Sequence, residues 1–251
     1  MLLGLLQGPA ELLPVSSSGH LALVPRLAGW DYADLPADAR KTFEVALHGG
    51  SAPALALALR GEALGDWRLL LTLLPPAAAG LAFERPIERR LGGLRSVAIA
   101  QVVAGTALLV SDLQPQRRAE PNALDHLAVG VAQAAALIPG VSRSGAALTA
   151  ARWRGLSRPA ALSLSLRAAL PVTVGAGALK GARAARDGVP NELRAPAAVG
   201  AAAACASALA ALPLARGTRW RALAAYRIAL GSAALCIRRR ARPLAQGPNR
   251  T

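Results

Sequence analysis

The chain has 251 residues, of which 53% are hydrophobic, 3% aromatic and 17% charged, with a formal net charge of +15. A soluble domain carries about 25% charged residues, and a basic domain that binds nucleic acid usually offers aromatic rings for base stacking. The composition therefore argues against a soluble enzyme, and we expect no nucleic acid as a partner. One helical crossing of a bilayer takes about 20 residues. The length and apolar composition of the chain therefore favour a polytopic helical membrane protein.

Eight apolar blocks follow one another along the chain, and charged connections separate them. They are rich in Ala and Leu, longer than β-strands and without alternation of apolar and polar residues, so strands are disfavoured. We predict an all-α fold in which residues 1–251 form a single integral membrane domain in the lipid bilayer. The blocks lie at about residues 2–25, 43–59, 67–83, 95–111, 124–150, 160–180, 195–215 and 222–237.

Polar and helix-breaking residues interrupt two of these blocks. The first block contains Gly8-Pro9, Pro14 and the run Ser16-Ser17-Ser18-Gly19-His20. The fifth contains Pro139-Gly140 and the run Ser142-Arg143-Ser144-Gly145. Backbone of this kind is tolerated at membrane depth only where protein buries it or where it lines a wet cavity. We therefore expect two re-entrant, broken-helix segments.

The two interrupted segments match each other without gaps at one offset, 126 positions from Gly4 to Gly130. Duplicated halves with interrupted helices at corresponding positions are typical of an inverted repeat with a polar site between the halves. We predict repeat halves at about 1–120 and 121–240. The other matched pairs are Gln7 with Gln133, Leu12 with Ile138, Val15 with Val141, Ser16 with Ser142, Ser18 with Ser144 and Gly19 with Gly145.

A basic C-terminal tail at 238–251 begins with Arg238-Arg239-Arg240-Ala241-Arg242, directly after the last apolar block. Cytoplasmic segments of membrane proteins carry an excess of Lys and Arg near the membrane. The tail therefore places the C-terminus in the cytoplasm.

Gln7 and Glu11 are four residues apart, so on a helix they share a face. There they can coordinate a hard cation or position a water molecule. An acidic side chain inside an apolar segment is a functional-site candidate by default. The alternative is a Glu that caps a helix or pairs with an Arg.

The two serine-rich runs predict an anion-binding site. Successive N–H groups and hydroxyls in a Gly/Ser turn form an anion site, and His20 can act as general acid or base. Arg143 can hold phosphate oxygens with its planar fork. A structural ion pair between Arg143 and Glu11 is a second interpretation, compatible with the first. Together these groups suit the hydrolysis of a phosphate ester or anhydride.

At these motifs the sequence resembles the undecaprenyl-diphosphatase family, the bacitracin-resistance type of integral membrane pyrophosphatase. Further similar pieces are Lys41 to Val45, Ser165 to Pro171 with Gly175-Ala176, and Tyr226-Arg227, so the resemblance covers nearly the whole chain. The matched motif residues are Gln7, Glu11, Pro14, Ser16, Ser17, Ser18, Gly19, His20, Pro139, Gly140, Ser142, Arg143, Ser144 and Gly145.

The resemblance implies removal of the terminal phosphate from undecaprenyl diphosphate, which gives undecaprenyl phosphate for cell-wall synthesis and confers bacitracin resistance. It also implies a divalent cation, Mg²⁺ or Ca²⁺, and a multi-pass location in the bacterial cytoplasmic (inner) membrane. The active site is expected to face the outer side, and a homodimer is a candidate assembly.

The resemblance also implies roles for individual residues. Glu11 with Gln7 serves the metal or the water, Ser17 is the nucleophile or a phosphate ligand, His20 is the acid or base, and Arg143 clamps the diphosphate. Both a covalent phospho-serine route and an activated-water route remain open. The expected substrate contacts are Ser16, Ser18, Gly19, Ser142, Ser144 and Gly145.

Some positions depart from the family pattern. Ala147 replaces a Thr, although Thr149 follows two residues later, and His48 stands where a Gln is usual. Ser163 and Arg167 replace residues that are commonly acidic and apolar, and the chain starts close to its first motif. These departures bear on activity more than on fold.

Two other classes of function remain open. A lipid-phosphate flippase or transporter can use the same inverted-repeat architecture, and a structural membrane protein can retain a decayed site. The combination of Glu11, His20 and Arg143 favours the phosphatase, because a carrier needs a cation to bind its substrate but no acid or base beside a carboxylate.

Overall fold

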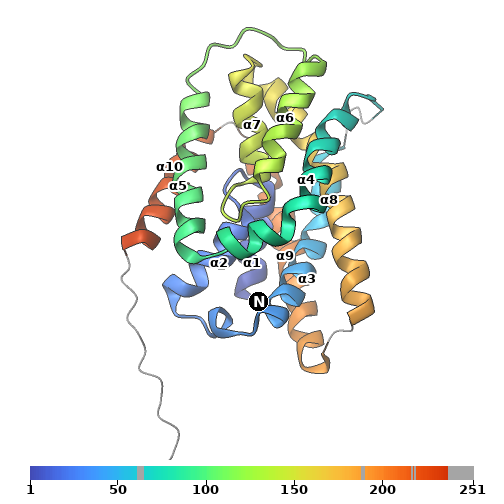
Figure 1. Ribbon diagram of the computed structural model, residues 1–251, viewed down its shortest axis with the longest axis vertical. Helices are drawn as coiled ribbons and strands as arrows, with labels where there is room; N and C mark the ends of the chain where they lie inside the picture. The colour runs from blue at the N-terminus through green and yellow to red at the C-terminus, as the bar shows by residue number, and fades with distance from the viewer. Residues whose placement is uncertain (61–64, 188–189, 216, 218, 237–251) are drawn as a thin grey trace, which may run out of the picture.

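The computed structural model describes residues 1–60, 65–187, 190–215, 217 and 219–236. Over these residues the chain forms ten α-helices and one short 3-10 helix, without a β-strand (Figure 1). The predicted all-α fold is confirmed. The basic tail predicted at 238–251 lies outside the described residues.

The helices fall into two successive groups of five. The first group is α1 (Leu2–Leu12), α2 (Ser17–Ala28), α3 (Ala37–Ala58), α4 (Leu69–Leu91) and α5 (Leu94–Ser111), with the 3-10 helix η1 (Asp31–Asp34) after α2. The second group is α6 (Ala123–Ala135), α7 (Arg143–Trp153), α8 (Arg158–Asp187), α9 (Asn191–Ala215) and α10 (Trp220–Cys236).

Both interrupted segments are helix, break and helix. The first break separates α1 from α2 at Leu13, which is extended with φ −87° and ψ 154°, as expected for a residue before a proline. Ser16 then starts α2 from a left-handed φ of 72°, a strain of about 1–3 kcal/mol that is typical of functional sites. The second break separates α6 from α7, where Gly140 takes a φ of 98° that glycine adopts without strain.

The spacing of 126 residues recurs at the helix starts. Helices α2 and α7 begin at Ser17 and Arg143, and helices α5 and α10 begin at Leu94 and Trp220. The packing of the two groups corresponds too, because α1 packs on α9 while α6 packs on α4. Each group therefore places its broken segment against the fourth helix of the other group.

Helices α5 and α10 cross closely at two glycines with the same spacing. A Cβ on Gly105 would lie 3.1 Å from the Ala224 carbonyl oxygen, and one on Gly231 would lie 2.6 Å from the Ala98 carbonyl oxygen. Both the glycines and the two alanines are 126 residues apart. The correspondence between the groups thus extends well beyond the serine-rich motifs.

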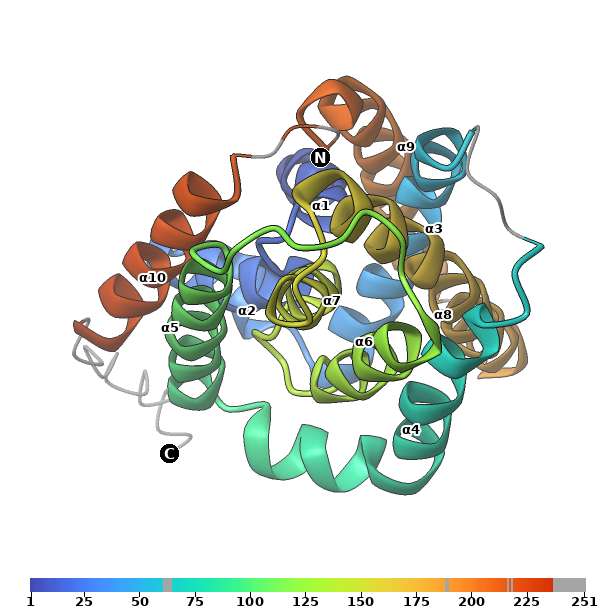
Figure 2. The same ribbon diagram turned by 90° about the horizontal axis from the view of Figure 1, so that it is seen from above.

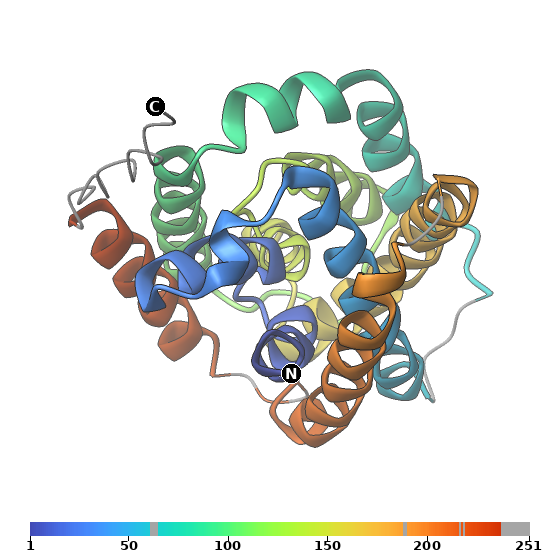
Figure 3. The same ribbon diagram turned by 90° about the horizontal axis from the view of Figure 1, so that it is seen from below.

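The helices surround the second break. Figure 2 shows α7 in the middle, with α5 and α10 on one side and α3, α8 and α9 on the other. Figure 3 shows the same order from below. Small and apolar side chains of α7 fill the central core, where Ala147 is 1% exposed and Leu148 packs with Leu108 and Trp220. The core thereby holds the start of α7 near the first break.

Two described helices, Leu94–Ser111 and Asn191–Ala215, are long and apolar enough to cross a membrane by length and composition. Large apolar side chains also face outward on several helices. On α5 these are Ile99, Val103 and Val110, and on α6 they are Leu124, Leu127 and Val131.

Candidate active site

Gln7 and Glu11 lie one turn apart on α1, as their spacing predicts. The Gln7 Nε2 donates to Glu11 Oε2 at 3.1 Å. His48 on α3 joins them, with its Nδ1 3.0 Å from Gln7 Nε2 and 3.1 Å from Glu11 Oε2. The Glu11 side chain is 5% exposed and Gln7 is fully buried, so this is an interior polar cluster.

Arg143 brings the second segment to the first. Its Nη2 donates to Glu11 Oε1 at 2.7 Å, and its side chain is 23% exposed. The ion pair between Arg143 and Glu11, which the sequence left open as a second interpretation beside phosphate binding, is present. The Arg143 Nε is buried without a hydrogen-bond partner among the described residues, so the guanidinium keeps donor capacity for an anion.

The two serine-rich runs make the same side-chain contacts, although their backbones differ, with a φ of 72° at Ser16 and −76° at Ser142. The Ser16 hydroxyl accepts from Gly19 N at 3.2 Å and lies 3.3 Å from the Ser18 hydroxyl. In the second run the Ser142 hydroxyl accepts from Gly145 N at 3.1 Å and lies 3.1 Å from the Ser144 hydroxyl. Each Ser caps a helix N-terminus by accepting from the N–H three residues along, which is the usual N-cap contact.

The breaks contact each other reciprocally. Gly140 N donates to the Ser18 hydroxyl at 3.4 Å, and the Ser144 hydroxyl donates to the Leu13 carbonyl at 3.3 Å. The predicted substrate contacts Ser16, Ser18, Gly19, Ser142, Ser144 and Gly145 thus lie in one region, at the starts of α2 and α7.

One buried guanidinium holds both breaks. Arg227 on α10 is fully buried and donates to the carbonyls of Pro14 at 3.3 Å and Gly140 at 3.0 Å. Its Nε donates to Gln101 Oε1 at 2.9 Å, and Gln101 Nε2 in turn donates to the Val15 carbonyl at 3.0 Å. The pairs Pro14 and Gly140, and Gln101 and Arg227, are each 126 residues apart, so corresponding positions meet here.

Ser17 occupies the first position of α2, as Arg143 does in α7. The Ser17 hydroxyl interacts electrostatically with the Glu11 carboxylate on the other side of the first break. First-turn N–H groups have no acceptor within their own helix, and the helix dipole makes this end positive. Two such ends beside a guanidinium form a site suited to a multiply charged anion.

His20 is 2% exposed, and its hydrogen bonds lead away from this cluster. Nδ1 lies 2.7 Å from the Ser16 carbonyl and therefore carries a proton, since a carbonyl oxygen only accepts. Nε2 lies 2.7 Å from the hydroxyl of Tyr226, whose ring stacks on the imidazole. Among the described residues, His20 is thus connected to Tyr226 rather than directly to Glu11 or Arg143.

The departures from the family pattern have different structural settings. Ala147 is packed in the core, and the Thr149 hydroxyl donates to the Gly145 carbonyl of its own helix at 2.8 Å. Thr149 is therefore held within α7 and does not replace the usual hydroxyl. A different hydroxyl, that of Ser165 on α8, donates to the Ser144 carbonyl of the second serine-rich run at 3.4 Å.

The fold brings to this site several residues for which the sequence alone predicts no role. They are His48, Gln101, Ser165, Tyr226 and Arg227. A usable signal existed for Gln101 and Arg227, because each is a long polar side chain inside an apolar block. His48 was visible only as a departure from a resemblance.

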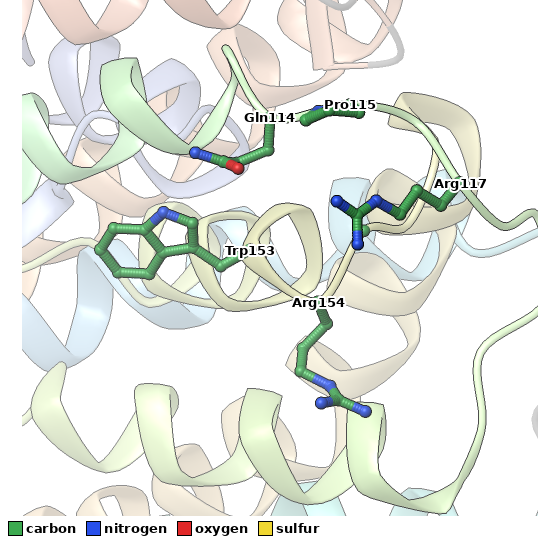
Figure 4. Close-up of a pocket in the computed structure, with 6 residues that line it drawn as sticks. Gln114, Pro115, Arg117, Trp153 and Arg154 are labelled. Atoms are coloured by element: carbon green, nitrogen blue, oxygen red, sulfur yellow. The ribbon is translucent and has the colours of Figure 1, made fainter.

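A separate pocket lies beyond the C-terminal end of α7 (Figure 4). Exposed Trp153 and two arginines, Arg117 and Arg154, surround it together with Gln114, Pro115 and Gly155. None of the predicted site residues lines it. The candidate active site is therefore the junction of the two breaks.

Comparison with known proteins agrees with these motifs. A family profile described as "Bacitracin resistance protein BacA" matches residues 1–233. An undecaprenyl-diphosphatase of Geobacter sulfurreducens is 37% identical over 218 residues, covering 77% of this chain and 79% of the relative. Those of Pelotomaculum thermopropionicum and Trichlorobacter lovleyi are 38% and 34% identical, covering 72% and 80% of this chain and 73% and 80% of each relative. The chain belongs to the bacitracin resistance protein BacA family.

Proposed function

We propose that this protein is an undecaprenyl-diphosphatase, which hydrolyses undecaprenyl diphosphate to undecaprenyl phosphate and inorganic phosphate. One observation carries the proposal: the 2.7 Å contact between Glu11 and Arg143 joins a carboxylate and a guanidinium from separate segments, at two serine-capped helix N-termini. The name undecaprenyl-diphosphatase on relatives at 34–38% identity supports it.

The diphosphate binds where positive groups converge. Arg143 offers a planar fork of donors that matches phosphate oxygens. The first-turn N–H groups of α2 and α7 add the partial positive charge of two helix N-termini. Hydroxyls of the two runs add neutral donors that adapt to either phosphate. In this arrangement the ion pair with Glu11 keeps Arg143 in place until the substrate arrives.

Hydrolysis breaks the bond between the terminal phosphorus and the bridging oxygen. A water molecule or the Ser17 hydroxyl attacks the phosphorus and loses its proton to the nearby carboxylate of Glu11. The bridging oxygen leaves with undecaprenyl phosphate, stabilised by Arg143 and the helix N-termini. On the Ser17 route, water then attacks phospho-Ser17 and releases phosphate. His20, hydrogen-bonded to Tyr226, is the second group that can exchange a proton.

A divalent cation fits the cluster on α1. The Gln7 Oε1 is buried without a hydrogen-bond partner among the described residues, beside the Glu11 carboxylate. An amide oxygen and a carboxylate are ligands that Mg²⁺ and Ca²⁺ accept. Gln7 and Glu11 would hold such a cation, which would supply positive charge for the phosphate oxygens.

The proposed setting is the inner membrane, with the chain as a polytopic inverted repeat whose two broken segments are re-entrant and whose site faces the outer side. Exposed apolar residues on α5 and α6 support contact with lipid. The recurring 126-residue spacing and the exchanged packing of α1 on α9 and α6 on α4 support the repeat.

The test is phosphate release from a polyprenyl diphosphate by the purified protein in detergent, with and without a chelator. We expect Glu11→Ala and Arg143→Ala to lower kcat/KM by at least about 10²-fold, the scale of losing a group that stabilises the transition state. Arg117→Ala, an exposed arginine in the pocket of Figure 4, is the matched control and should retain activity.

A transporter would give a different result. If the unmutated protein released no phosphate but moved labelled lipid across liposomes, the phosphatase proposal would be wrong. The comparisons do not favour that alternative, because the similar proteins carry a phosphatase name.

A further inference from the structure

Three ligating side chains meet in a triangle of nearly equal edges. Gln7 Nε2 is 3.1 Å from Glu11 Oε2 and 3.0 Å from His48 Nδ1, and that Nδ1 is 3.1 Å from Glu11 Oε2. The first two residues come from α1 and the third from α3, 41 positions from Gln7. All three were brought together by the packing of these helices.

Hydrogen bonds alone do not satisfy this triangle while Glu11 is ionised, as its pairing with Arg143 implies. If His48 Nδ1 is unprotonated, it and Glu11 Oε2 are two acceptors at 3.1 Å. If Nδ1 is protonated, it and the Gln7 amide nitrogen are two donors at 3.0 Å. Turning the Gln7 amide by a half-turn places its oxygen against Glu11 Oε2, so that two acceptors face each other. Every placement of protons leaves one edge unfavourable.

A cation removes the conflict, because it attracts all three groups at once. A half-turn of the Gln7 amide moves Oε1, now buried without a partner, to the corner that Nε2 occupies. An octahedral cation with bonds of about 2.1 Å has edges of about 3.0 Å between neighbouring ligands. The observed edges match that face. Arg143 holds only Glu11 Oε1, so Oε2 stays available.

We infer that His48 is a metal ligand which, with Gln7 and Glu11, makes a mixed nitrogen and oxygen face that selects a first-row transition cation such as Mn²⁺ over Mg²⁺ or Ca²⁺. Imidazole suits transition metals, whereas Mg²⁺ and Ca²⁺ take oxygen ligands. The His48 side chain is 31% exposed, which leaves open positions on the cation for water or a phosphate oxygen. The inference rests on the proposed function, since the cation would serve the same diphosphate site.

The test measures metal binding without substrate. The full chain in detergent is stripped with chelator and titrated with Mn²⁺, with free Mn²⁺ followed by EPR, and Mg²⁺ is then added as competitor. His48→Gln replaces the imidazole with an amide. We expect this variant to bind Mn²⁺ about tenfold or more weakly. The preference of the site for Mn²⁺ over Mg²⁺ should fall by the same factor. Pulsed EPR of bound Mn²⁺ should show ¹⁴N coupling that His48→Gln abolishes.

His20→Gln is the matched control, because it makes the same substitution at a second histidine near the breaks and should keep both Mn²⁺ affinity and the ¹⁴N signal. Thermal unfolding of the metal-free variants shows whether each is folded. Equal Mn²⁺ affinity with and without His48, and no ¹⁴N coupling, would overturn the inference and leave His48 as an ion-pair partner of Glu11. Normal metal binding without phosphate release would instead contradict only the proposed function.

Discussion

At the residue scale, the site depends on which atoms of a few side chains are already engaged. Glu11 presents one carboxylate oxygen to Arg143 and the other to Gln7 and His48. The two oxygens therefore serve two different purposes without competing. Because Arg143 comes from the second segment, a substitution of Glu11 disturbs both the proposed metal cluster and the proposed phosphate clamp.

Ser17 is the residue whose role separates the two chemical routes. We expect Ser17→Ala to lower kcat/KM by roughly 10–100-fold, since a hydrogen bond to a charged group contributes about 1.5–3 kcal/mol. Ser111→Ala, which removes a buried hydroxyl that bonds Leu108 far from the breaks, should leave turnover unchanged. Steady-state phosphate release measures both variants.

The covalent route makes a stronger demand on Ser17. A fall in kcat well beyond this range, together with a phosphorylated Ser17 trapped by mass spectrometry, would assign it as the nucleophile. Unchanged kcat/KM in Ser17→Ala would remove Ser17 from the site altogether.

At the scale of elements, close helix packing positions the breaks. On α3, neighbouring glycines differ in what surrounds them. A Cβ on Gly50 would lie 2.2 Å from the Ala201 carbonyl oxygen of α9, whereas a Cβ on Gly49 would meet nothing within 4 Å. Since α9 also packs on α1, the contact at Gly50 supports the helix that carries Glu11.

The two glycines make a matched pair for stability. We expect Gly50→Ala to destabilise the fold by about 1–3 kcal/mol, because the clash is with backbone that cannot turn aside. Gly49→Ala should be neutral or stabilising by up to about 1 kcal/mol, because Ala favours the helix over Gly. Thermal unfolding in one detergent compares them. Equal effects in both variants would show that the α3 and α9 backbones are not in contact.

At the scale of the whole molecule, part of the excess of arginine joins helix ends. Asp112, at the end of α5, is fully buried at its side chain and binds Arg158 at 2.6 Å and Arg221 at 2.9 Å, with Arg152 at 3.9 Å. These arginines belong to α8, α10 and α7. One carboxylate therefore ties four helices at one end of the molecule.

Burial alone would raise the pKa of the Asp112 carboxyl, but hydrogen bonds from Arg158 and Arg221 outweigh it and hold the pKa below its usual value. A lowered pKa means that the stabilisation is complete above the ordinary Asp pKa, about 3.9, and is lost as the pH falls through the lower folded value. The contribution of Asp112 is thus constant near neutral pH and disappears only in strong acid.

Asp112→Asn should destabilise the protein at pH 7 by about 1–3 kcal/mol, between the values for exposed and buried pairs because the arginines are partly exposed. The difference in unfolding temperature from the unmutated protein should shrink as the pH falls below about 4. Glu120→Gln, an exposed carboxylate of the same loop, is the control and should show no such difference. A gap that persisted unchanged into strong acid would contradict the linkage to Asp112.

The helical class, the two broken segments and the side-chain contacts within each of them follow from the sequence alone. The i and i+4 contact of Gln7 with Glu11 and the N-cap of Ser16 on Gly19 are set by helix geometry within a few residues. The match between the two segments also made a meeting of Glu11 and Arg143 a reasonable prediction.

Which distant residues complete the site depends on how the helices pack. His48 reaches Glu11 because α3 packs on α1, and Tyr226 and Arg227 reach His20 and the breaks because α10 packs near α2. Such contacts depend on how long helices cross, and the composition of an apolar block does not encode that crossing residue by residue. The metal preference inferred for this protein therefore follows from the fold, not from its motifs.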